Sequence, residues 1–177
     1  MTEGEREGTL ADGSTPATSQ ELLSRLRDLG IEAPLMEHEA VFTVEQAKAV
    51  RGGLEGCHTK NLFVRNKKES MWLVTCLADR AVDLKWLGEH IGAGRLSFGS
   101  PRRLMRFLGV TPGAVSPFAI VNDGQRRVRV VLDREVLKQE PINFHPLDNR
   151  MTVTIGAKDF VRFLESERHA PQIITFP

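Results

Sequence analysis

The chain has 177 residues, 24 of them Lys or Arg and 23 Asp or Glu, and its formal net charge at pH 7 is +1. This length suits one ordinary domain, and the balanced charge gives no global sign of a nucleic-acid or membrane partner. Two cysteines are too few for a disulfide framework or a zinc motif. No apolar run reaches the roughly 20 residues that span a bilayer. Without a signal peptide, the sequence predicts a cytoplasmic protein.

The N-terminal region predicts a tail followed by a helix. Residues 1–17 are polar and rich in Gly, Thr, Ser, Pro and Glu, which predicts disorder, and one domain is expected over 18–177. A helix is expected to follow Ser19 and to end before Gly30. Its apolar face would carry four leucines: Leu22, Leu23, Leu26 and Leu29.

The rest of the chain alternates between strand and helix patterns. Strands are expected at 35–39, 61–65, 71–77, 96–99, 118–122, 128–132, 142–145, 151–155 and 173–176. Helices are expected at 43–50, 84–91, 101–108, after a cap at Asp133, and at 157–167. Turns at 66–70 and 123–124 predict two hairpins. Hairpins between helices predict a single α/β (α+β) domain with a mixed, mostly antiparallel sheet flanked by helices.

Residues 109–120 are the segment most suggestive of a functional site. Gly113 and Pro117 form a Gly-x-x-x-Pro pattern; Gly113 can adopt backbone angles that other residues avoid, and Pro117 fixes its own φ. The side chains between them are small or medium in size: Ala114, Val115 and Ser116. Such a loop can present several backbone N–H groups in an arc. The alternative is an ordinary turn that enters a strand.

Isolated polar residues near apolar strands are further candidates. Lys60 enters an apolar strand, which predicts either a fixed cation for a phosphate or a lysine whose amine reaches water. His145 follows a strand, which predicts a bond to a ligand or to a loop carbonyl. Four arginines predict a local phosphate track or an ordinary solvated face: Arg95, Arg102, Arg103 and Arg106.

Other side chains fit structural roles better. Cys57 and His58 are adjacent, but neighbours in a strand point to opposite faces, so a small buried cysteine is favoured over a thiolate pair. Asp123 and Asp133 occupy turn and cap positions rather than forming an acid and base pair. The sequence has no cluster of His, Cys and carboxylates at metal-ligand spacing, and no metal is expected.

Several of these pieces occur together in the order of a known family. They are His58-Thr59-Lys60-Asn61-Leu62-Phe63-Val64, Met71-Trp72-Leu73-Val74, residues 109–120, Asn143-Phe144-His145-Pro146 and Thr152-Val153-Thr154-Ile155. Residues 18–177 resemble the YbaK-like, prolyl-tRNA-synthetase-associated editing domains, especially the free-standing deacylases of mischarged alanyl-tRNA(Pro). The resemblance implies a YbaK-like fold with a partly closed barrel and no cofactor. The implied partners are the acceptor end of tRNA(Pro) and prolyl-tRNA synthetase.

The resemblance also assigns roles to residues. Lys60 matches the lysine that engages the phosphate of the terminal nucleotide, and Asn61 follows it as in close relatives. Gly113 and Pro117 match the catalytic loop whose main chain surrounds the aminoacyl group and its carbonyl, and His145 matches a position near the terminal nucleoside. Substrate contacts are also expected along the loop, at Ala114, Val115 and Ser116.

The implied reaction is hydrolysis of the aminoacyl ester, with the terminal ribose 2′-hydroxyl helping to orient water and loop N–H groups stabilising the oxyanion. Arg95 and Arg102 would contact the tRNA acceptor stem, and residues 44–47 would form the opposite wall of a small pocket that excludes proline. Three alternatives remain open: editing of another small amino acid such as Ser or Cys, a non-catalytic tRNA- or synthetase-binding module, and a Cys-dependent hydrolase.

Overall fold

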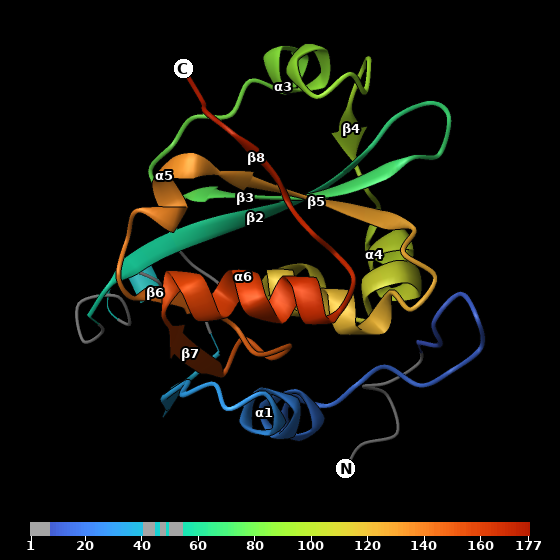
Figure 1. Ribbon diagram of the computed structural model, residues 1–177. Coiled ribbons are helices and arrows are strands. Elements are labelled where there is room, and N and C mark those ends of the chain that lie inside the picture. Colours follow the sequence, from blue (N-terminus) through green and yellow to red (C-terminus); the bar gives the residue numbers. More distant parts are fainter. Residues whose placement is uncertain (1–7, 41–44, 47–48, 50–54) are drawn as a thin grey trace.

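The computed structural model describes residues 8–40, 45, 46, 49 and 55–177 (Figure 1). The helices are α1 (Ser19–Asp28), α3 (Leu84–His90), α4 (Pro101–Leu108), α5 (Arg134–Leu137) and α6 (Ala157–Ser166), with 3₁₀ helices η1 (Pro112–Ala114) and η2 (Pro117–Asn122). The strands are β1 (Leu35–Glu37), β2 (Cys57–Arg65), β3 (Met71–Leu77), β4 (Ser97–Phe98), β5 (Val128–Asp133), β6 (Ile142–Phe144), β7 (Met151–Ile155) and β8 (Gln172–Ile174). Within the residues described, no helix is long and apolar enough to cross a membrane.

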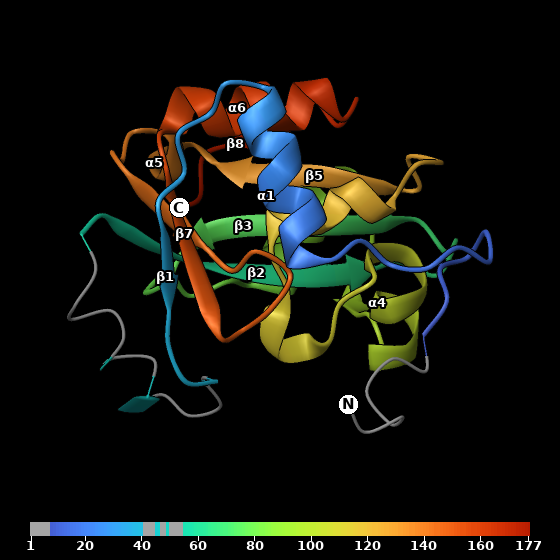
Figure 2. The ribbon, with the colours of Figure 1, turned by 90° about the horizontal axis from the view of Figure 1, so that it is seen from below.

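The strands form one eight-stranded mixed sheet in the order β1-β7-β6-β2-β3-β5-β8, with β4 paired to β2. The antiparallel pairs are β1–β7, β6–β7, β2–β3 and β2–β4, and the parallel pairs are β2–β6, β3–β5 and β5–β8. In both views β7 runs steeply across the direction of β2 and β3, so the sheet bends strongly near β6 (Figures 1 and 2). The expected mixed, mostly antiparallel sheet flanked by helices is confirmed.

Local sequence signals explain several elements that the sequence predicts. The β2–β3 hairpin turns at Asn66, whose side-chain Oδ1 accepts from the backbone N–H groups of Lys68 and Ser70, both at 3.0 Å. Helix α4 begins with Pro101 after Ser100, whose hydroxyl accepts from the backbone N–H of Arg103 at 3.1 Å. These predictions are therefore confirmed.

The expected strand at 118–122 is wrong, and so is the hairpin that it would form with β5. Pro117 begins η2 instead, and the Ser116 hydroxyl accepts from the backbone N–H of Phe118 at 3.2 Å. Strand β5 pairs in parallel with β3 and with β8. A short apolar run that is buried on all sides has no periodicity to separate a strand from a helix, and a cap followed by proline favours the helical turn.

Part of the expected N-terminal tail packs on the domain. Leu10 is buried, and the backbone N–H of Ala11 donates to the carbonyl of Arg106 at 2.8 Å. The backbone N–H of Ala17 donates to Asn122 Oδ1 at 2.8 Å, immediately before α1 and its N-cap Thr18. Residues 1–7 and most residues of the helix expected at 43–50 lie outside the described residues.

Two apolar clusters cover the two faces of the central strands. We call the face of β2 that carries Phe63 the inner face and the face that carries Lys60 the outer face. The larger cluster joins the inner face to buried residues of α1, α4, η2 and α6, including Leu22, Leu104, Phe118, Phe160 and Phe163. The smaller cluster joins the outer face of β3 to α3 and β8, through Trp72, Val74, Cys76, Leu87 and Ile174.

Candidate functional site

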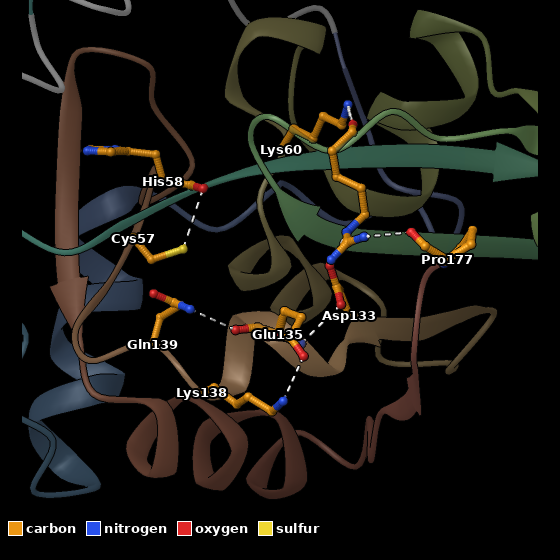
Figure 3. Close-up of polar contacts among 9 residues, drawn as sticks. Cys57, His58, Lys60, Asp133, Glu135, Lys138, Gln139 and Pro177 are labelled. Carbon is orange, nitrogen blue, oxygen red and sulfur yellow. Dashed lines mark hydrogen bonds and ion pairs between the residues drawn. The ribbon is translucent and has the colours of Figure 1, made fainter.

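The alternation of side chains along β2 sets the direction of Lys60. Lys60 is the cross-strand partner of Cys76, which belongs to the outer cluster, so its side chain lies on the outer face. Its Nζ donates to the carbonyl oxygen of Arg80 (Figure 3). Asn61 points to the inner face, where its Oδ1 accepts from the Thr75 hydroxyl at 2.7 Å. The two neighbours expected to bind substrate together therefore lie on opposite faces of the sheet.

The parallel pairing of β2 with β6 places the strand that leads to His145 beside the start of β2. His58 is the Cα partner of Asn143 in this pair, and β6 ends one residue later at Phe144. His145 therefore lies in the loop just beyond the paired residues. His58 and Lys60 share the outer face of β2, and the register puts Asn143, two residues before His145, on that face.

The His145 ring is held in one orientation by β7. Its Nδ1 donates to the carbonyl of Met151 at 2.8 Å, which leaves Nε2 as the acceptor nitrogen of the neutral ring. Burial lowers the pKa of His145, and the nearby His38 lowers it further, against the opposing effects of the Met151 hydrogen bond and Asp148. The centroids of the two rings are 6.1 Å apart, and His38 Nε2 bonds Thr152 Oγ1 at 2.9 Å. The site therefore favours an uncharged imidazole.

The Gly-x-x-x-Pro loop is exposed in its first half and buried in its second half. Thr111, Pro112 and Gly113 are exposed, whereas Ala114, Ser116 and Pro117 are buried and Val115 is partly buried. Three backbone N–H groups donate hydrogen bonds within the chain: that of Ala114 to the Thr111 carbonyl, that of Ala119 to the Ser116 carbonyl, and that of Phe118 to the Ser116 hydroxyl. These three N–H groups already have acceptors, so they are not part of the arc of backbone donors expected to bind a substrate.

The surroundings of Gly113, rather than its backbone angles, favour glycine at this position. Gly113 lies in η1 without a positive φ, so the expected unusual backbone angles are not observed. A Cβ there would instead lie 3.1 Å from Asn149 Nδ2. Asn149 belongs to the loop between β6 and β7 that begins at His145, and Figure 2 shows this loop beside the η1 segment. The close contact thus joins the Gly-x-x-x-Pro loop to the His145 region.

The positive φ in this segment belongs to Gly109, at 65°, where it ends α4. A Cβ on Gly109 would lie 2.5 Å from Asn122 Nδ2. That amide donates to the carbonyl of Leu108 at 2.9 Å, so Asn122 closes the base of the loop. The sequence signals for Asn122 and Asn149 were weak, because each asparagine lies beside ordinary turn residues.

Arg95 and Arg102 lie at the other end of β2. Arg95 is exposed before β4, and Arg102 is exposed on the first turn of α4. Their neighbour Arg103 is paired with Glu69 at 2.6 Å. Residues 44 and 47, expected at the ends of the opposite pocket wall, lie outside the described residues.

A cavity of about 450 Å³ opens at the start of β2, next to the Lys60–Arg80 bond. It is lined by Cys57, His58, Leu77, Ala78, Asp79 and Arg80. Cys57 Sγ lies 3.5 Å from the His58 carbonyl oxygen, and the His58 ring points away from the sulfur (Figure 3). Burial raises the pKa of the Cys57 thiol, which disfavours a thiolate nucleophile.

Among the described residues, no group of three or more His, Cys, Asp or Glu side chains is arranged to hold a metal ion. The buried carboxylate of Asp133 pairs with the Arg80 guanidinium at 2.6 Å (Figure 3). Asp133 also caps α5, as the sequence predicts.

Comparison with known proteins gives the family. Residues 38–163 match the profile of the aminoacyl-tRNA editing domain. The chain belongs to this family. It is 39% identical to prolyl-tRNA synthetase associated domain-containing protein 1 of Danio rerio, over 89% of this chain and 86% of that protein. It is 35% identical to the prolyl-tRNA editing protein ProX of Acetoanaerobium sticklandii, over 83% of this chain and 90% of that protein.

A more distant relative is the multifunctional Ser/Thr-tRNA deacylase ProXp-y of Escherichia coli, with 28% identity over 89% of this chain and 93% of that protein. The fold matches a crystal structure described as a candidate trans-editing enzyme for prolyl tRNA synthetase, with a TM-score of 0.67 and 18% identity over 91% of this chain and 98% of that one. The resemblance noted in the sequence is confirmed. The chain is an aminoacyl-tRNA editing enzyme of the deacylase class.

Proposed function

We propose that this editing enzyme hydrolyses mischarged alanyl-tRNA(Pro) and leaves prolyl-tRNA(Pro) intact. The observation that carries the proposal is the pairing of β2, the strand of Lys60, with β6, the strand that leads to His145, together with the closeness of Gly113 to Asn149 in the loop after His145. The names of the ProX and prolyl-tRNA-synthetase-associated relatives favour tRNA(Pro) as the substrate. A loop of small residues suits an alanyl group better than a larger one.

In this mechanism the Lys60 ammonium binds the phosphate of the terminal nucleotide and so fixes the ester beside the loop. His145 faces the terminal ribose with Nε2 as an acceptor, which suits a hydrogen bond from a hydroxyl group. The ribose 2′-hydroxyl orients the attacking water. Backbone N–H groups near Gly113 stabilise the oxyanion that develops on the ester carbonyl, and the ester bond then breaks to release alanine and the tRNA hydroxyl.

A deacylation panel tests this proposal. The full-length chain is incubated separately with alanyl-, seryl-, cysteinyl-, threonyl- and prolyl-tRNA(Pro), and release of the amino acid is followed over time. We expect alanine to be released fastest and proline to remain attached. An unchanged level of alanyl-tRNA(Pro) would overturn the proposal.

A second specificity has support from one relative. The 28% identical ProXp-y is named as a Ser/Thr-tRNA deacylase, so seryl or threonyl esters are the main alternative substrates. Faster release of serine or threonine than of alanine would select this alternative. We further propose that the enzyme acts in the cytoplasm on tRNA released by prolyl-tRNA synthetase, without a metal. A chelator in the same assay should leave the rate unchanged.

A further inference from the structure

Phe98 is an exposed aromatic side chain on the short strand β4. It is 62% exposed, against 42% for Leu35 and 39% for Ile173. The next residue holds the backbone in place, since the Gly99 N–H donates to the Phe63 carbonyl at 2.9 Å and a Cβ on Gly99 would lie 2.5 Å from the Phe63 ring. Because neighbouring strand residues alternate, Phe98 points to the outer face beside its partner Val64. The fold therefore presents this ring to solvent from a backbone that is held by hydrogen bonds and strand pairing.

The surroundings of Phe98 are strongly basic. Residues 65–70 and 95–103 meet where β4 pairs with β2, and together they carry six basic side chains and one acidic side chain. The acidic residue, Glu69, forms ion pairs with Arg103 at 2.6 Å and with Arg65 at 3.6 Å. Arg95 and Arg102 are exposed on the two sides of Phe98 in the chain. An exposed ring among cations is the combination that binds single-stranded nucleic acid, because bases stack on the ring while cations pair with phosphates.

An open edge of β2 connects Phe98 with Lys60. On the side away from β3, β2 pairs with β6 at Cys57 and His58 and with β4 at Val64 and Arg65. Between these points, residues 60–62 have no strand partner on that side in the part of the chain that the structure describes. Val64 follows Lys60 by four residues, about 13 Å along a strand. One extended strand of nucleic acid can therefore touch both Phe98 and Lys60.

We propose that Phe98 is the stacking platform for an unpaired base of the tRNA acceptor end, next to the terminal nucleotide. The 3′ strand then follows the open edge of β2 from Phe98 to Lys60. This deepens the proposed function and rests on it for the position of the terminal phosphate at Lys60. A peptide strand bound along the same edge would use backbone hydrogen bonds and would leave the ring and its arginines without a partner.

The test uses a fluorescently labelled single-stranded RNA that ends in CCA, with binding to the full-length chain followed by anisotropy. Phe98→Ala and Phe98→Leu should weaken binding about 10-fold, because both remove the aromatic face, and Phe98→Trp should retain it. Ile173→Ala, an exposed apolar residue on the opposite edge strand β8, is the matched control and should bind as the wild type does.

Salt dependence separates stacking from charge. The logarithmic salt slope should be the same for Phe98→Ala and wild type, whereas Arg102→Ala should reduce it by about 1. Wild-type affinity in Phe98→Ala or in Phe98→Leu would overturn the platform, as would no binding of the RNA by the wild-type chain at low salt.

The KM for alanyl-tRNA(Pro) distinguishes this failure from failure of the proposed function. If alanine is released and Phe98→Ala has the wild-type KM, the platform is wrong while the function stands. If the RNA binds in a Phe98-dependent way but alanine is not released, the specificity is wrong while the platform stands.

Discussion

The two faces of β2 differ in what they contact, although their side chains alternate along one strand. The inner face carries Phe63 into the larger cluster beneath α1, η2 and α6. The outer face carries Lys60, whose cross-strand partner Cys76 belongs to the smaller cluster under α3. One strand thus separates the main core on one side from the proposed substrate site on the other, and substitutions on the two faces should have different effects.

The largest loss of stability is expected from a substitution in the larger cluster, on the inner side of β2. Phe118 is fully buried, with ring centroids 5.6 Å from Phe144 and 5.2 Å from Phe163. Phe118→Ala should lower the free energy of unfolding by about 3–5 kcal/mol, because it removes a large side chain from a packed core. Urea denaturation followed by circular dichroism measures this loss. A change below about 1 kcal/mol would contradict the assignment of this cluster as the main core.

On the outer side, Lys60→Ala should reduce deacylation about 100-fold or more while the free energy of unfolding changes by less than about 1 kcal/mol. The reason is that the substrate loses its phosphate anchor, whereas the amine contributes only one partly exposed bond to the Arg80 carbonyl. Lys158→Ala, on the exposed surface of α6, is the matched control. Rate assays and denaturation of the same preparations would separate the two effects, and equal losses of both would refute the division between faces.

In the Gly-x-x-x-Pro loop, Gly113→Ala should slow deacylation about 10-fold with little effect on folding. The added Cβ would lie 3.1 Å from Asn149 Nδ2, so that amide or the loop must shift by a few tenths of an ångström. Gly124→Ala is the control, because a Cβ there meets no atom within 4 Å. A rate for Gly113→Ala equal to that of the control would show that the contact with Asn149 has no part in the reaction.

Titration of His145 should change the free energy of unfolding, by less than the core substitution does. Because burial lowers its pKa in the folded chain, the unfolded chain binds more protons just below the ordinary histidine range near 6.5. The free energy of unfolding should therefore fall as the pH is lowered through that range, and His145→Gln should flatten part of this slope. Denaturation midpoints measured in a pH series for both proteins give the difference. Identical slopes would show that His145 does not titrate differently on folding.

The smallest effect is expected for Cys57→Ala, with a rate within about twofold of the wild type. The thiol faces a carbonyl oxygen at 3.5 Å, and its pKa is raised by burial. Inactivation of this variant would instead revive a thiolate mechanism.

Features encoded by neighbouring residues were predictable from the sequence, and features encoded by distant pairing were not. Ser100 with Pro101 marks the start of α4, and Asp133 marks the start of α5, because each cap bonds backbone groups within three residues. The sequence predicts a strand where the 3₁₀ helix at 117–122 lies, since a short apolar run with four consecutive buried residues, 117–120, has no periodicity that separates the two. The parallel pairs of β2 with β6 and of β3 with β5 leave no local signal.

The same division applies to the candidate site. Lys60, Gly113 and His145 could be singled out from residue type and family resemblance. Their relation could not, because the position of β6, which leads to His145, beside β2 depends on the β2–β6 register. The contact of Gly113 with Asn149 depends on how two loops meet. The roles of all three in the reaction remain predictions for the assays above.

Asn122 has a consequence for the order of folding. Its side chain bonds the Leu108 carbonyl at the base of the Gly-x-x-x-Pro loop and the backbone N–H of Ala17, which is 105 residues away in sequence. A contact of such separation closes a long stretch of chain, and the entropy of that closure must be offset before the contact becomes favourable. We therefore expect the loop to reach its final shape late in folding, after α1 has docked. A chain whose N-terminal segment has not yet packed would then lack a finished loop.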